Sequence, residues 1–215
     1  MKKIQTKIML LVMAATLGVS AVNSLQGVKT TRNSTISAIE KTLGETTKLA
    51  ATAAQNMIST YTLIIAEIAA NPMLYDPNLS QTQKQEFIQS KVELYYMRFG
   101  GMADLNGYDA VHDVDISEEP FFQEAMKGTN YMSSPYVDGD DLFLIVSAPI
   151  KEGDTIHGVL YFQCDSYILQ SIVEEIQIGE EGESYILDKY GVTIACGNKE
   201  AVLEQENITE EALEN

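Results

Sequence analysis

The segment "LFLIVSAPIKEGDTIHGVLYFQCD", Leu142–Asp165, decides the fold. It holds two strand-like apolar runs, Leu142–Pro149 and Ile156–Cys164, on either side of Glu152-Gly153-Asp154. Glycine adopts the positive φ angles that tight turns require, so this arrangement predicts an antiparallel β-hairpin. We expect the hairpin to form part of an antiparallel sheet.

Turn and helix signals continue on the N-terminal side of this hairpin. Asp138-Gly139-Asp140 turns the chain into the first run, and Asp104-Leu105-Asn106-Gly107 predicts another hairpin turn between two extended runs. Apolar periodicity predicts helices at Gln81–Met97 and Glu118–Met126, the second ended by Gly128. Antiparallel strands with helices before and between them predict an α+β fold.

The N-terminus carries a membrane signal. Lys2, Lys3 and Lys7 precede an apolar run from Ile8 to about Val22. Such a run is close to the length of about 20 residues that a membrane helix needs, and the lysines would stay in the cytoplasm. We therefore expect a basic tip and membrane helix at 1–28, with the rest of the chain outside the cytoplasm. A cleaved signal peptide is the alternative, because Val19-Ser20-Ala21 resembles a cleavage site.

A long helix is expected next. Apolar and small residues recur mainly in steps of three and four from Leu25 to Ile68, until Asn71-Pro72 ends the pattern. We assign 29–71 to a stalk helix whose seam would form a parallel homodimer. Its later half, Met57–Ile68, is expected to pack on its own domain.

Composition excludes some classes of function. The formal net charge is −17, which repels phosphate backbones and argues against a nucleic-acid partner. Cys164 and Cys196 stand alone, so we expect buried free thiols, with a disulfide between them as the alternative.

No catalytic or cofactor motif is evident. The two histidines are His112 and His157, and the sequence has neither a phosphate-binding loop nor a serine-nucleophile motif. His112, Asp113 and Asp115 suggest a metal cluster, but successive residues of a strand point to opposite faces. We therefore expect no cofactor and no enzymatic activity, with a secreted or tethered hydrolase as a disfavoured alternative.

A series of segments carries a family resemblance. In order, "ADLNGYDAV", "DISEEPFFQEAMKGTNYMSSPYV", "LFLIVSAPI", "GVLYFQCDSYILQSIV" and "IGEEGESYILDKYGVTIACGNKE" resemble the double-Cache (dCache) sensory domain of bacterial methyl-accepting chemotaxis receptors. The resemblance runs from about Lys29 to at least Glu200. It implies a membrane-distal, PAS-like lobe at 72–176 and part of a membrane-proximal lobe at 177–215. The family continues into a second membrane span and an output domain, so we expect either a receptor fragment or a truncated relative, weakly ordered after about Gly197.

The resemblance also implies a ligand pocket in the distal lobe. Members that bind amino acids resemble one another in the pattern YxxxxRxWYxxA, followed by a Tyr and an Asp, where the Arg holds the ligand carboxylate and the Asp its ammonium group. Aligned on Ala125, this sequence places Glu119 at the Arg and Gln163 at the Asp. The first Tyr, the Trp, the second aromatic and the later Tyr are matched by Val114, Phe121, Phe122 and Tyr136.

Loss of both charged partners changes the expected ligand. The Arg is needed for an anionic group, so we expect a cationic or neutral ligand instead. Asp165 lies two residues beyond Gln163, on the same strand face, and could receive a cation. The alternative is that Phe121 and Phe122 only anchor a helix to the sheet. The expected ligand-binding residues are Phe121, Phe122, Tyr131, Tyr136, Glu119, Gln163 and Asp165.

The expected function is therefore extracytoplasmic sensing of a small molecule at the bacterial cell membrane. Binding in the distal lobe would be transmitted along helices to a chemotaxis output module. A sensor histidine kinase or a diguanylate cyclase carrying the same sensory module is the alternative.

Overall fold

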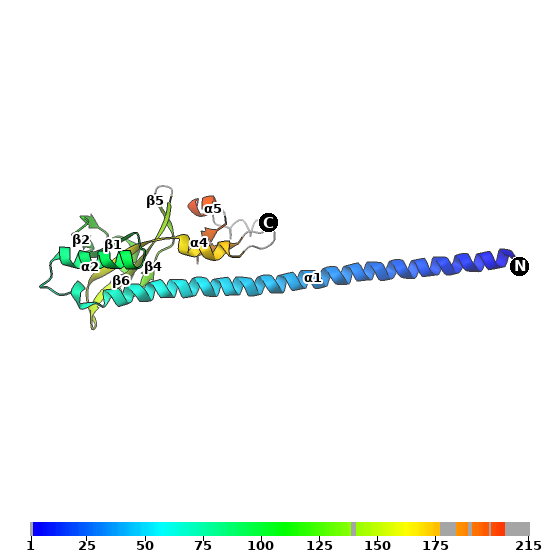
Figure 1. The fold of residues 1–215 in the computed structure, drawn as a ribbon, viewed down its shortest axis with the longest axis horizontal. Coiled ribbons are helices and arrows are strands. Elements are labelled where there is room, and N and C mark those ends of the chain that lie inside the picture. The colour runs from blue at the N-terminus through cyan, green and yellow to red at the C-terminus, as the bar shows by residue number, and fades with distance from the viewer. Residues whose placement is uncertain (1, 139–140, 177–183, 189–190, 198, 205–215) are drawn as a thin grey trace. The chain divides into compact units, whose positions relative to one another are not determined.

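The computed structural model describes residues 2–138, 141–176, 184–188, 191–197 and 199–204 (Figure 1). Backbone contacts divide the chain into two compact units, Met1–Lys48 and Leu49–Asn215.

The first unit is the beginning of α1, which runs from Lys2 to Ala69. Its apolar side chains are exposed, among them Leu11, Leu17 and Leu25. The helix contains a segment that is long and apolar enough to cross a membrane, a criterion that a signal sequence also meets. The long helix expected from Leu25 to Ile68 is confirmed, whereas its dimerisation stays a prediction.

The second unit is built around an antiparallel sheet. The strands are β1 (Phe99–Ala103), β7 (Thr155–Asp165), β6 (Asp141–Glu152) and β4 (Tyr131–Met132), hydrogen-bonded in that order, and β5 (Tyr136–Asp138) also pairs with β6. β6 and β7 form the hairpin expected from Leu142–Asp165, and Gly153 takes a φ of 60° in its turn. The α+β prediction is confirmed.

Both faces of the β6–β7 hairpin are covered, which explains why its apolar runs do not alternate with polar residues. One face packs against the end of α1 and against α2 (Gln81–Leu94), and the other lies under α3 (Pro120–Met126). The first face contributes Leu144, Val146, Ala148, Ile150, Leu160, Phe162 and Cys164, which pack against Ile65, Ile68 and Ala69 of α1.

The helices mostly follow the sequence predictions. Asn71 caps the short helix η1 (Pro72–Leu74), and α2 begins with a capping box between Ser80 and Gln83. The helix predicted at Gln81–Met97 ends earlier, at Leu94, and Leu94 and Tyr96 are 59% and 95% exposed. Both lie at the C-terminal end of the helix, just before the chain enters β1.

The turn at Asp104–Gly107 forms, because the Gly107 N–H donates to the Asp104 carbonyl at 3.1 Å. The expectation that it joins two paired strands is wrong. β1 pairs with β7, while β2 (Tyr108–Asp109) pairs with β3 (Val114–Asp115) in a separate ladder. The segment after β1 thus leaves the sheet and passes over its α3 face.

The C-terminal elements are α4 (Tyr167–Glu174), β8 (Tyr185–Leu187), β9 (Thr193–Cys196) and α5 (Lys199–Leu203), with β8 paired to β9. Leu169, Val173 and Ala195 join the core that α1 contacts. Cys164 and Cys196 are buried and form no disulfide, as expected. The expected lobe boundary at 177 and most of the segment predicted to be weakly ordered after Gly197 lie outside the described residues.

Candidate functional site

A cavity of about 620 Å³ lies over the sheet face that α3 covers. Its walls come from β1, β4–β7, α3 and the loop between β2 and β3. Five of its residues are apolar and seven are tyrosine, serine, glutamine or glutamate, besides a histidine and a proline. The lining is Phe99, His112, Val114, Ile116, Glu119, Pro120, Phe121, Tyr131, Ser133, Ser134, Tyr136, Ile145, Tyr161 and Gln163.

The floor of the cavity consists of side chains that the strand pairing aligns in rows across the sheet. Phe99 on β1 and Ile145 on β6 both lie opposite Gln163 on β7, so three side chains form one row across the sheet. Tyr161 lies two residues before Gln163 and therefore on the same face, with Ser147 opposite it on β6. The hairpin thus supplies both the apolar and the polar parts of the floor.

α3 forms one wall and is fastened to the floor. Pro120 occupies its first turn, where the missing N–H costs no hydrogen bond. The buried Ser147 hydroxyl donates to the Phe121 carbonyl at 2.7 Å. The Phe121 and Tyr161 rings lie 5.5 Å apart between centroids. Glu119, at the N-terminus of α3, is exposed and also lines the cavity.

Tyr136 on β5 forms a polar pair with Gln163 of the floor. The Gln163 amide Nε2 donates to the Tyr136 hydroxyl at 2.8 Å. The Ile145 N–H donates to the Ser133 hydroxyl at 2.8 Å, which holds the segment between β4 and β5 against β6. These groups can position polar atoms of a bound molecule in a largely apolar cavity.

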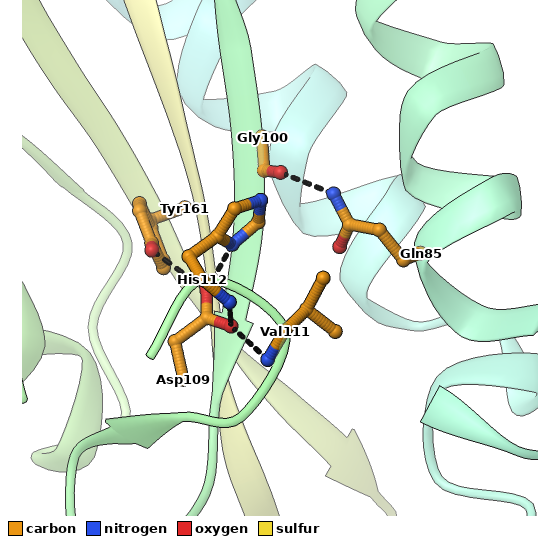
Figure 2. A network of polar contacts seen from close by, with 6 residues as sticks. All are labelled: Gln85, Gly100, Asp109, Val111, His112 and Tyr161. Carbon is orange, nitrogen blue, oxygen red and sulfur yellow. Dashed lines mark hydrogen bonds and ion pairs between the residues drawn. The ribbon is translucent and has the colours of Figure 1, made fainter. Parts of the chain in front are cut away.

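A buried carboxylate lies behind the cavity wall. Asp109 is 0% exposed, and its Oδ1 accepts from the Val111 and His112 backbone N–H groups at 3.0 and 3.1 Å. Its Oδ2 accepts from the Tyr161 hydroxyl and contacts His112 Nδ1, both at 2.8 Å. Figure 2 shows these contacts converging on the carboxylate, while Gln85 from α2 donates to the Gly100 carbonyl on β1.

Gly101 makes room for this network. A Cβ atom there would lie 2.5 Å from Asp109 Oδ2 and 2.6 Å from the Tyr161 hydroxyl, closer than any real contact. Burial raises the pKa of Tyr161, and its hydrogen bond to Asp109 raises it further. Tyr161 is therefore a neutral hydrogen-bond donor to the carboxylate.

The cavity contains five of the seven expected ligand-binding residues: Glu119, Phe121, Tyr131, Tyr136 and Gln163. Phe122 is not among its lining residues and packs in the cluster of Phe121, Ala125 and Val159. Asp165 lies at the end of β7, where its carboxylate accepts from the Tyr167 N–H at 2.8 Å beside a separate hollow. The ligand-binding roles of the five remain a proposal.

Sequence reasoning missed His112 and Asp109. Strand alternation predicts that residues 112–115 point to opposite faces in turn, but Asp113 has a φ of 56° and the chain turns there. His112 consequently faces Asp109, three residues before it, rather than Asp113 or Asp115. The Asp-x-x-His spacing was the available signal. Nowhere in the described residues do three His, Cys, Asp or Glu side chains gather to hold a metal ion.

No protein-family model matches the sequence, and no curated protein matches it significantly. Solved structures do resemble it. The ligand-binding domain of the Pseudomonas aeruginosa PAO1 amino acid chemoreceptor PctC, in complex with GABA, superposes with a TM-score of 0.66 at 14% identity, covering 80% of this chain and 81% of that one.

Two further receptors give similar values. The corresponding domain of P. aeruginosa PctB with L-Arg has a TM-score of 0.61 at 20% identity, covering 76% of this chain and 73% of that chain. The Campylobacter jejuni Tlp3 (CcmL) sensory domain with isoleucine has a TM-score of 0.60 at 18% identity, covering 80% and 77%. The chain therefore has the dCache-type fold of bacterial chemoreceptor ligand-binding domains.

Proposed function

We propose that the chain is the extracytoplasmic sensory part of a bacterial chemoreceptor and that it binds a small molecule in the cavity over the β6–β7 hairpin. The observation that carries this proposal is the cavity of about 620 Å³, whose lining includes five residues expected from the sequence. That volume lies within the range of about 300–1,000 Å³ typical of small-molecule sites. Solved domains of the same fold hold amino acids or GABA, which supports a ligand of that size.

The bound molecule is uncharged overall or cationic. Glu119 lines the cavity at the position where the family's amino-acid pattern has an Arg. Among the described lining residues there is no Lys or Arg to balance an anionic ligand. An organic anion would have to approach the Glu119 carboxylate without such a partner, which opposes its binding.

The β6–β7 hairpin would transmit the signal, because one of its faces lines the cavity and the other packs against α1. Tyr161 and Gln163 line the cavity, whereas Phe162 and Cys164 point to the other face and pack in the core that contains Ile65 and Ile68 of α1. A ligand that favours one arrangement of the hairpin therefore also favours one packing of the end of α1. Binding biases a conformational equilibrium, and no chemical reaction is involved.

α1 would anchor this sensor and pair it with a second copy. Its early part is apolar enough for a membrane span, and lysines at its N-terminus favour the orientation that puts residues 72–176 outside the cytoplasm. The apolar stripe along 29–71 suits a parallel homodimer. The same sensor could equally serve a histidine kinase or a diguanylate cyclase, because ligand binding does not depend on the output module.

The test is ligand-induced thermal stabilisation of the full chain in detergent. A panel of small amines, amides, amino acids and dicarboxylates would be screened, and each hit would be repeated on Tyr136→Ala. We expect this variant to lose the stabilisation, because Tyr136 and its bond to Gln163 form one cavity wall. Tyr96→Ala is the matched control, since it removes a tyrosine ring that is 95% exposed and outside the cavity.

Three outcomes reject the proposal. They are a panel without any hit, a hit that stabilises Tyr136→Ala as much as the parent, and binding of dicarboxylates without binding of amines or uncharged solutes. The last outcome would reject the ligand charge in particular.

A further inference from the structure

We propose that His112 is the polar anchor of this cavity and that its Nε2 donates a hydrogen bond to a carbonyl or carboxylate of the ligand. The ligand would then be a small molecule with an apolar body, one such acceptor and an N–H donor, and no net charge. This inference rests on the proposed function, since it assigns the ligand chemistry of the same cavity.

The position of the ring is fixed by its neighbours. His112 Nδ1 lies 2.8 Å from Asp109 Oδ2, and the ring meets Phe99 edge to face at 4.4 Å between centroids. The side chain is 24% exposed, while the Asp109 side chain is 0% exposed. Nδ1 therefore points into the protein, and in the described part of the chain Nε2 has no hydrogen-bond partner. Figure 2 shows the ring standing over the Asp109 carboxylate.

The carboxylate sets the tautomer of the ring. Asp109 Oδ1 accepts two backbone N–H groups, and the Tyr161 hydroxyl is directed to Oδ2. An ionised carboxylate has only acceptors, so Nδ1 carries a hydrogen atom and donates it to Oδ2. In the neutral ring this leaves Nε2 as an acceptor, and Nε2 donates only in the imidazolium form, in which both ring nitrogens carry a hydrogen atom.

Asp109 also balances charge. A protonated imidazole in a largely apolar wall is costly unless an anion pairs with it, and Asp109 is that anion. His112 can thus present Nε2–H to an acceptor while the pair stays neutral. Such a charge-assisted hydrogen bond is stronger than one between neutral groups.

Glu119 completes the recognition. It lines the same cavity at its exposed edge and can accept from an N–H of the ligand. In the amino-acid pattern the Arg that aligns with Glu119 binds the ligand carboxylate. Here His112 would bind the carboxylate or carbonyl of the ligand instead, and Glu119 would accept a hydrogen bond from its N–H group. Primary amides and zwitterions carry both groups with no net charge, whereas a simple amine lacks the acceptor and a simple acid lacks the donor.

The experiment compares four probes that share one branched aliphatic body: isovaleramide, L-leucine, isopentylamine and isovalerate. Calorimetric titration of the full chain should show binding of isovaleramide or L-leucine and weaker or no binding of the other two. In His112→Asn the affinity should fall by about tenfold or more, the loss of one charge-assisted hydrogen bond. The asparagine amide can still donate to Asp109 from near the position of Nδ1, so the fold is retained.

His157→Asn is the matched control, because it replaces the other histidine, which is exposed and outside this cavity. A second measurement does not depend on a variant. With two histidines in the chain, the ¹⁵N ring signals can be assigned through His157→Asn, and a bound probe should shift the Nε2 signal of His112.

The inference is overturned if none of the four probes binds, if isopentylamine or isovalerate binds best, or if His112→Asn binds as tightly as the parent. Its failure is distinguishable from failure of the proposed function. A probe whose binding is lost in Tyr136→Ala but kept in His112→Asn leaves the cavity in place and rejects His112 alone.

Discussion

At the scale of single residues, Asp109 is the group on which the cavity wall depends. Its carboxylate is fully buried and bonded to two backbone N–H groups, a tyrosine hydroxyl and an imidazole. Removing one partner of a buried, hydrogen-bonded charge leaves the others unsatisfied, which costs more than the bonds themselves contribute.

Asp109→Asn should therefore destabilise the fold by about 2–4 kcal/mol. The amide nitrogen of asparagine would replace one carboxylate oxygen. Its N–H groups would then face N–H or O–H donors that now bond to that oxygen. Urea denaturation checks this. Circular dichroism is the suitable probe of unfolding, because the chain contains no Trp whose fluorescence could be followed.

Asp113→Asn is the control for this comparison. Asp113 is exposed, accepts from the Tyr108 hydroxyl at 2.6 Å, and has a positive φ that asparagine tolerates. Its substitution should change stability by less than about 1 kcal/mol. Equal stabilities of the two variants would contradict the role given to Asp109.

Single residues were also the hardest to predict. Phe121 and Phe122 are adjacent on a helix, so they point about 100° apart and only Phe121 lines the cavity. Asp165 has the right strand parity, but it stands at the end of β7 and bonds to the backbone of Tyr167. His112 was missed because strand alternation does not hold through a turn with a positive φ.

At the scale of elements, α2 shows how local sequence fixes a boundary. The Gln83 N–H donates to the Ser80 hydroxyl at 3.3 Å, and the Ser80 N–H donates to the Gln83 side chain at 3.0 Å. Two donors that the helix itself cannot satisfy are thereby paired. The helix thus begins where its capping residues lie.

Ser80→Ala should lower the free energy of unfolding by about 1 kcal/mol, because it removes this cap. Ser90→Ala is the matched control. The exposed Ser90 hydroxyl donates to a carbonyl of its own helix at 2.6 Å, and its loss should change stability by less than about 0.5 kcal/mol. Thermal melting of both variants checks this, and a smaller effect for Ser80→Ala than for Ser90→Ala would argue against the cap.

Elements were more predictable than residues, since each has a local signal. The β6–β7 hairpin followed from two apolar runs and a glycine turn, and α1 followed from its periodicity and from Asn71-Pro72. Pairing between distant segments has no such signal. The partner of β1 is β7, more than fifty residues later, and the Asp104–Gly107 turn gave no indication of it.

At the scale of the whole molecule, the second unit places a cavity and a helix contact on opposite faces of one hairpin. The fold is shared with chemoreceptor domains at only 14–20% identity, and a shared fold does not fix the chemistry of a site. In this chain the acidic residue Glu119 lines the cavity. An Asp–His pair lies in the same wall.

The most direct test of ligand sensing by this cavity is a crystal structure of the chain with its best-binding probe. The ligand is expected between α3 and the sheet, in contact with Tyr136, Gln163 and His112. A ligand bound instead in the separate hollow beside Asp165 and Tyr167, with this cavity unoccupied, would contradict the account.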